Sequence, residues 1–146
     1  VLDNYQSYGI ATKYLDLNNI KNEIFETSYD YIIMSEVLEH LVSPEEIINT
    51  LKPFTKCFIL TIPNSAFYRY RIGLLFGGRF FTQWVYHPSE HLRYWSHIDF
   101  LDWLKALGLS VEEVFHSNGF SFFGLPLFRW FPNLFSLQIC YIARTR

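Results

Sequence analysis

The sequence is poor in cysteine, in net charge and in long uncharged apolar runs. Cys57 and Cys140 are its only cysteines, and both stand in apolar runs, so we expect two buried free thiols and no disulfide framework. A formal net charge of −2 argues against a general nucleic-acid surface. No uncharged apolar run reaches the roughly 18–20 residues of a membrane span. Because no signal peptide is visible either, we expect a cytoplasmic protein.

What the chain does have is enough apolar residues for a sizeable core. Half of its 146 residues are hydrophobic and 20% are aromatic. This length predicts one domain, residues 1–146, with an insertion at about 65–95.

The order of apolar runs and polar turns predicts an α/β fold. Helix 44–52 has a good start, because Ser43 can cap it and Pro44 occupies its first position. Ser96 followed by Asp99 gives helix 96–107 a similar start. We predict strands at 11–16, 29–34, 56–62, 109–117 and 136–144, an irregular or helical segment at 65–77, and a loop at 78–95. Strands that alternate with helices form a parallel sheet, and the last two strands, with no helix between them, form an antiparallel hairpin.

Residues 29–41 are the most informative stretch. The β-forming run Tyr31-Ile32-Ile33-Met34 ends in a polar turn, after which apolar residues recur at helical spacing. The ligand crevice of an open α/β sheet lies outside the carboxyl ends of its strands. We therefore expect four polar residues around that crevice: Ser35, Glu36, Glu39 and His40.

At Val37-Leu38-Glu39-His40-Leu41 the chain resembles the class I S-adenosylmethionine-dependent methyltransferases. Further segments resemble that family in the same order along the chain: residues 14–17, 58–64, 90–96 and 108–110. The Pro63-Asn64 turn, followed by a Tyr/Arg-rich segment and Gly77-Gly78-Arg79, is most similar to the MetW-like branch. The resemblance implies a Rossmann-like methyltransferase fold and S-adenosyl-L-methionine as cofactor.

The resemblance also implies roles for single residues. Asp16 would accept from the adenine amino group, and His91 would be the base that removes a proton from the acceptor. The remaining cofactor-binding residues would be Leu17, Ser35, Glu36, Val37 and His40. The acceptor-binding residues would be Asn64, Tyr68 and Tyr94.

The glycine-rich loop that binds the methionine end of the cofactor in this family is missing from the sequence. We interpret residues 1–8 as the tail of a helix that ends at Gly9, and we expect a fold truncated at its N-terminus. The native polypeptide would then be longer by ~60–80 residues, the length of two βα units. Two functions compete: methyl transfer to a small-molecule or lipid-like acceptor, and a non-catalytic relic or partner subunit that has lost the cofactor.

Several residues keep a structural alternative. His91 could tie its loop to Glu90, His40 could pair with a nearby carboxylate on a helix face, and Asn64 could serve a turn. The set His87, Glu90, His91 and His97 lacks the paired spacing of a zinc motif, so we expect no metal site.

The aromatic segment 67–76 contains two arginines and could form a lid over the acceptor or a helix at a membrane surface. The alternative is that it packs against the apolar segment 120–135.

Overall fold

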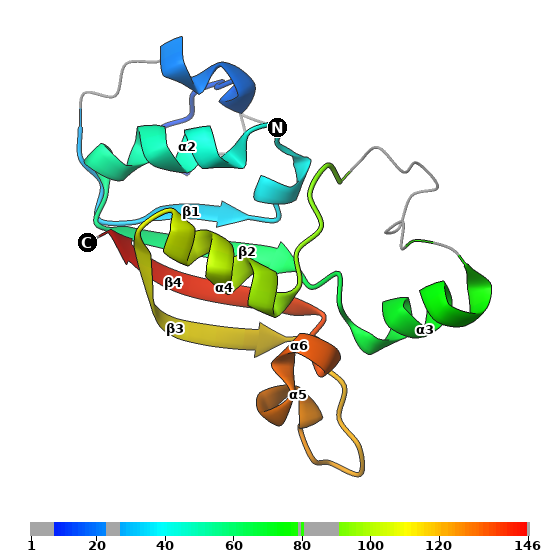
Figure 1. The fold of residues 1–146 in the computed structure, drawn as a ribbon. Helices are drawn as coiled ribbons and strands as arrows, with labels where there is room; N and C mark the ends of the chain where they lie inside the picture. Colours follow the sequence, from blue (N-terminus) through cyan, green and yellow to red (C-terminus); the bar gives the residue numbers. More distant parts are fainter. Residues whose placement is uncertain (1–7, 23–26, 79, 81–90, 146) are drawn as a thin grey trace.

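The fold is built on one four-stranded sheet, seen in a computed structural model that describes residues 8–22, 27–78, 80 and 91–145 (Figure 1). The strands are β1 (Ile32–Ser35), β2 (Cys57–Pro63), β3 (Leu109–Ser117) and β4 (Gln138–Thr145), in the order β1-β2-β4-β3. β1 and β2 are parallel, and β4 is antiparallel to both β2 and β3. Three strands therefore run in one direction and β4 alone in the other, which confirms the α/β fold and the terminal antiparallel hairpin, although β1–β2 is the one parallel pairing among the described strands.

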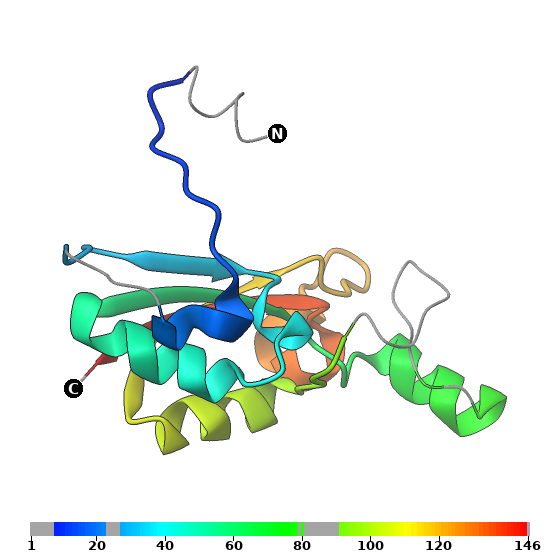
Figure 2. The same cartoon turned by 90° about the horizontal axis from the view of Figure 1, so that it is seen from above.

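Two helices cover one face of the sheet, α2 (Pro44–Leu51) and α4 (His97–Ala106) (Figure 2). In α2, Ile47, Ile48 and Leu51 are buried, because their spacing places them on one side of the helix. α4 begins with the predicted capping box, in which the Ser96 side chain accepts from the Asp99 backbone N–H and Asp99 accepts from Ser96.

The core lies between these helices and the sheet. β2 contributes Phe58, Leu60 and Ile62, which alternate along the strand and so point to the helix-covered face. β4 contributes Ile139, Tyr141 and Ala143 in the same way, and α4 adds Phe100 and Leu104.

The predicted strand 11–16 is wrong. Residues 10–16 have no regular secondary structure, and the ring of Tyr14 is 82% exposed, so this segment lacks both the ladder partner and the burial that hold a strand in place. A 3-10 helix, η1 (Leu17–Asn22), follows. Apart from Tyr8, the predicted helix tail 1–8 lies outside the described residues.

The other elements differ from prediction mainly at their ends. The segment 65–77 contains helix α3 (Tyr68–Gly77), which projects from the body of the fold (Figure 1). The connector between β3 and β4 is not helix-free, because prolines help to start two one-turn helices, α5 (Leu127–Trp130) and α6 (Pro132–Phe135). Of the predicted loop 78–95, residues 79 and 81–90 lie outside the described part of the chain.

Both cysteines are free thiols, as predicted; Cys57 is buried and Cys140 is half-buried. Among the described helices, none combines the length and the apolar character needed to span a bilayer.

Candidate functional site

The candidate site begins where β1 ends. Glu36 follows the last residue of β1 and has a φ of 53°, in the left-handed region that costs a residue with a side chain about 1 kcal/mol. Its backbone N–H donates to the Thr61 carbonyl of β2 at 3.0 Å, which fixes the turn against the neighbouring strand. Strain that the surroundings enforce is common at functional sites, and it aims the Glu36 side chain at the end of the sheet.

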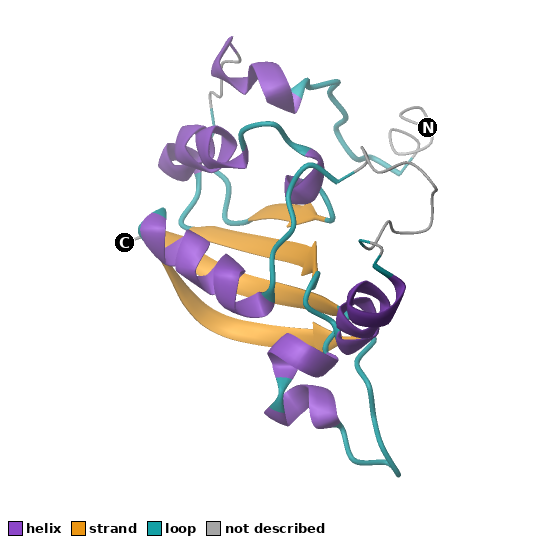
Figure 3. Cartoon of the chain, turned by 45° about the vertical axis from the view of Figure 1, so that its right-hand side comes forward, coloured by secondary structure: helices purple, strands orange, loops and turns teal. Residues whose placement is uncertain are grey.

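A helical turn, η2 (Leu38–His40), follows directly and receives a loop from far along the chain (Figure 3). The Glu39 carbonyl accepts from Leu92 N at 2.7 Å and from Arg93 N at 3.1 Å. These bonds hold His91 beside His40, with ring centroids 4.7 Å apart at 81°. Residues that are about fifty positions apart in sequence thus share one site.

The Glu39 carboxylate is the unusual group here. The residue is 1% exposed, and within the described part of the chain neither carboxylate oxygen has a hydrogen-bond partner. The His40 Nε2 lies 3.9 Å from its Oε1. Burial raises the pKa of Glu39 to about 7, and the nearby charge of Glu36 adds to that shift. Burial also raises the pKa of Glu36, so two carboxylates meet here in a poorly solvated place.

Two of the predicted cofactor-binding residues, Leu17 and Val37, line a largely apolar hollow of about 270 Å³. The hollow runs along β1, from Tyr29 and Tyr31 before the strand to Met34 near its end. Asp16 stands directly before η1 and accepts from Asn18 N and Asn19 Nδ2, both at 3.0 Å. An apolar slot with an exposed carboxylate beside it fits the flat base and amino group of adenosine, so this side of the site suits the cofactor.

The predicted acceptor-side residues separate into two places. Tyr94 lies near His91, with ring centroids 6.3 Å apart. Tyr68 instead packs against Phe120 and Phe135, at 5.1 Å and 5.7 Å. The sequence left open whether the segment 67–76 packs against the segment 120–135. Tyr68, the first residue of α3, makes such a contact.

Asn64 has a structural role. It is fully buried, its Nδ2 donates to the carbonyls of Ser136 at 2.8 Å and Asn133 at 3.2 Å, and its Oδ1 accepts from Ala66 N at 3.0 Å. These bonds join the end of β2 to the start of β4, which is the turn role that the sequence allowed.

Of the histidine cluster considered in the sequence, the structure describes only His91 and His97. His87 and Glu90 lie outside the described residues. His97 Nδ1 lies 2.8 Å from the Tyr141 hydroxyl, and burial lowers the pKa of this imidazole. What the structure assembles in its place is Glu39, His40 and His91, whose ligand atoms all lie within 4.8 Å of one another.

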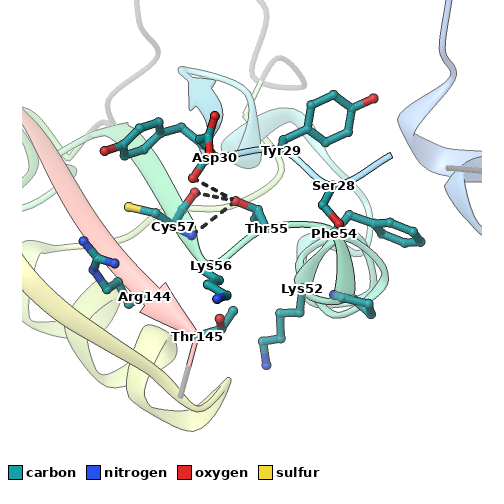
Figure 4. Close-up of a pocket in the computed structure, with 12 residues that line it drawn as sticks. Ser28, Tyr29, Asp30, Lys52, Phe54, Thr55, Lys56, Cys57, Arg144 and Thr145 are labelled. Atoms are coloured by element: carbon teal, nitrogen blue, oxygen red, sulfur yellow. Dashed lines mark hydrogen bonds between the residues drawn. The ribbon is translucent and has the colours of Figure 1, made fainter. Parts of the chain in front are cut away.

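A second hollow, of about 650 Å³, lies at the opposite end of β1 and β2 (Figure 4). Thr55 ties its wall together by donating to the Asp30 carbonyl and accepting from Cys57 N. None of the predicted site residues lines it.

Sequence reasoning placed Glu39 in the motif but gave it no role. The spacing Glu36-x-x-Glu39-His40 was the available signal, because residues three and four apart fall on one side of a helical turn. Burial of Glu39 and the approach of His91 arise from tertiary structure.

Comparison with known proteins gives one family. The family model described as "Methionine biosynthesis protein MetW" matches residues 5–143. No curated protein matches the chain.

Two solved structures share the fold. A S-adenosylmethionine-dependent methyltransferase from Clostridium acetobutylicum ATCC 824 has 13% identity, a TM-score of 0.60 and coverage of 98% of this chain and 68% of that one. The small RNA methyltransferase HEN1 has 21% identity, a TM-score of 0.54 and coverage of 82% of this chain. The chain spans only 14% of the length of that HEN1 structure. These similarities confirm the Rossmann-like methyltransferase fold.

Proposed function

The chain belongs to the MetW family, and from that premise we propose that it takes part in S-adenosylmethionine-dependent methyl transfer to a small-molecule or lipid-like acceptor. One observation carries the proposal. Along β1, an apolar hollow that is lined by Leu17 and Val37 and lies beside Asp16 reaches the turn that carries Glu36, Glu39 and His40 and receives His91. A base-sized slot next to a polar, partly buried cluster is the arrangement that a nucleotide-derived cofactor and a second reactant need.

The residues divide the work between two sides of β1. Leu17 and Val37 line the slot for the adenine ring, and Asp16 accepts a hydrogen bond at its edge. Ser35 and Glu36 form the turn along which the rest of the cofactor lies. When bound, S-adenosylmethionine supplies a methyl group that is already activated, so the protein contributes mainly by holding the acceptor in line.

The acceptor side is the cluster at η2. His91 is 8% exposed and His40 lies edge-on to it, and both rings lie next to the Glu39 carboxylate. Tyr94 lies at the rim of this cluster and is half-exposed, where it can contact an acceptor. Asn64 and Tyr68 support the loops and helices around the site from the far side.

Calorimetric titration with S-adenosylmethionine and S-adenosylhomocysteine tests this proposal, using protein expressed from its complete reading frame. Asp16→Ala should weaken binding about 5–150-fold, which corresponds to about 1–3 kcal/mol for one lost hydrogen-bond partner. Asp30→Ala is the matched control, because that exposed carboxylate stands at the opposite end of β1 and should leave binding unchanged.

The proposal fails if a folded wild-type protein binds neither compound. That result would favour a non-catalytic partner subunit. Equal weakening by Asp16→Ala and Asp30→Ala would move the cofactor away from the hollow at Leu17 and Val37.

A further inference from the structure

A buried carboxylate without a partner is expensive. Removing an ionised group from water costs several kcal/mol unless a counter-charge or a set of hydrogen bonds replaces the lost solvent. Among the described residues the Glu39 carboxylate oxygens have no hydrogen-bond partner, and the His40 Nε2 stands 3.9 Å away, although Glu39 is 1% exposed. A native structure keeps such a group when something else occupies the site, and a bound ion is one of the usual reasons.

The groups around Glu39 are all metal ligands by type. One carboxylate oxygen and one ring nitrogen from each of His40 and His91 lie within 4.8 Å of one another. Two imidazoles and one carboxylate make a common ligand set for catalytic transition-metal sites, which leave further positions open for water or substrate. Ligand atoms bound at about 2.1 Å to a tetrahedral ion lie about 3.4 Å from one another. The three ligand atoms here, which lie within 4.8 Å of one another, would therefore have to move closer together on binding an ion.

We propose that Glu39, His40 and His91 bind a divalent first-row transition-metal ion at the carboxyl end of β1. Glu36 lies close enough to Glu39 for the two carboxylates to repel each other. Glu36 also has a buried oxygen without a hydrogen-bond partner among the described residues. The positive charge of the ion would therefore stabilise both carboxylates. A preference for a transition metal over Mg²⁺ follows from the two imidazoles, since Mg²⁺ prefers oxygen ligands.

The backbone of the site is prepared for this role. Two backbone N–H groups of the 91–93 loop converge on the Glu39 carbonyl, and Arg93 Nη2 also donates to the Val42 carbonyl at 2.6 Å. The loop is therefore bonded to η2 itself and to the residue two positions after it, which holds His91 close to the two ligands on η2. Hydrogen bonds that hold the ligating residues in place set the geometry of a metal site.

The role of the ion rests on the proposed function. An ion with open positions beside the cofactor slot would hold an acceptor oxygen and lower its pKa. His91 would then act as a ligand instead of a base, and the proton of the metal-bound acceptor hydroxyl would leave to water.

Titration of the metal-free protein with ZnCl₂ in a calorimeter, and with CoCl₂ followed by visible absorption, tests the site directly. We expect one ion per chain. His40→Ala should weaken Zn²⁺ binding by at least about 100-fold. Losing a residue that only hydrogen-bonds to a metal ligand already costs about 10–100-fold in metal affinity, and loss of the ligand itself should cost more. The His40 side chain is 44% exposed, so this variant should fold, and circular dichroism checks that it does.

Two further variants sharpen the result. Glu39→Gln should weaken Zn²⁺ binding to a similar extent, since an amide lacks the negative charge. His116→Ala should leave it unchanged, because that half-buried histidine lies on β3 beside the Ser136 hydroxyl, away from η2.

Absence of stoichiometric binding, or equal affinity in wild type and His40→Ala, would overturn the site. Metal binding that persists in a protein unable to bind S-adenosylmethionine would leave the site standing and refute the proposed function. S-adenosylmethionine binding without any metal binding would support the proposed function and refute the metal site.

Discussion

At the scale of single residues, Asn64 is the side chain on which the turn after β2 depends. It donates to carbonyls of the α6–β4 junction and accepts from Ala66, all within a fully buried environment. Asn64→Ala should lower the free energy of unfolding by about 2–3 kcal/mol, because it leaves buried backbone groups without partners.

Urea unfolding measures this effect. Asn49→Ala is the control, since Asn49 is exposed on α2 and its loss should change stability by no more than about 0.5 kcal/mol. If both substitutions had equally small effects, the hydrogen bonds of Asn64 would not support the turn as described.

The same residue shows what sequence can and cannot give at this scale. A Pro-Asn pair at a strand end predicts a turn, and the structure contains it. Whether Asn64 faces a ligand or the protein depends on residues 132–136, almost seventy positions later, which no local pattern identifies. His40 and His91 illustrate the same limit, because each is recognisable as reactive but their contact is made by the tertiary fold.

At the scale of elements, α3 is a helix that contributes no buried residue to the core. Its residues Ile72, Leu75 and Phe76 are more than half exposed, and Arg69 and Arg71 give it positive charge with no acidic residue in its first turn. We propose that these exposed apolar side chains contact anionic lipid, with the two arginines nearby to meet its headgroups.

Co-sedimentation with vesicles of phosphatidylcholine, with and without phosphatidylglycerol, tests this proposal. The wild-type protein should bind the anionic vesicles, and the double variant Leu75→Ser with Phe76→Ser should bind at least about tenfold less, since burying each side chain is worth about 1.5–3 kcal/mol. Tyr14→Ser removes an equally exposed ring from another segment and should have no effect. Equal binding of all three proteins would exclude α3 as the contact.

Helices that begin with a capping residue or a proline, and strands with alternating apolar residues, were predictable from sequence. The segment 11–16, which has neither feature, was not. The Ser43-Pro44 start, the Ser96–Asp99 capping box and the alternating strands of the hairpin lie where the pattern placed them. The expected strand 11–16 rested on the resemblance of residues 14–17 to the methyltransferase family and had no start signal of its own. In the structure, Asp16 instead accepts hydrogen bonds from Asn18 and Asn19 and so starts η1, a local competition that propensity does not resolve.

At the scale of the whole molecule, the two ends of the sheet have different characters. The carboxyl ends of β1 and β2 carry strained Glu36, buried Glu39 and the paired histidines. The opposite end has the larger of the two hollows described above, but its wall is tied by structural bonds such as those of Thr55 (Figure 4). The general placement of ligands in open α/β sheets therefore favours the carboxyl end, where we propose the site.

A crystal structure of the protein with S-adenosylhomocysteine tests the central claim most directly, because it shows where the cofactor product lies. We predict that the adenine ring occupies the slot lined by Leu17 and Val37 and that the sulfur lies on the Glu36 side of β1. A ligand in the hollow beside Thr55 and Lys56 would contradict the account. So would crystals of folded protein that contain no ligand at a concentration well above that which saturates related methyltransferases.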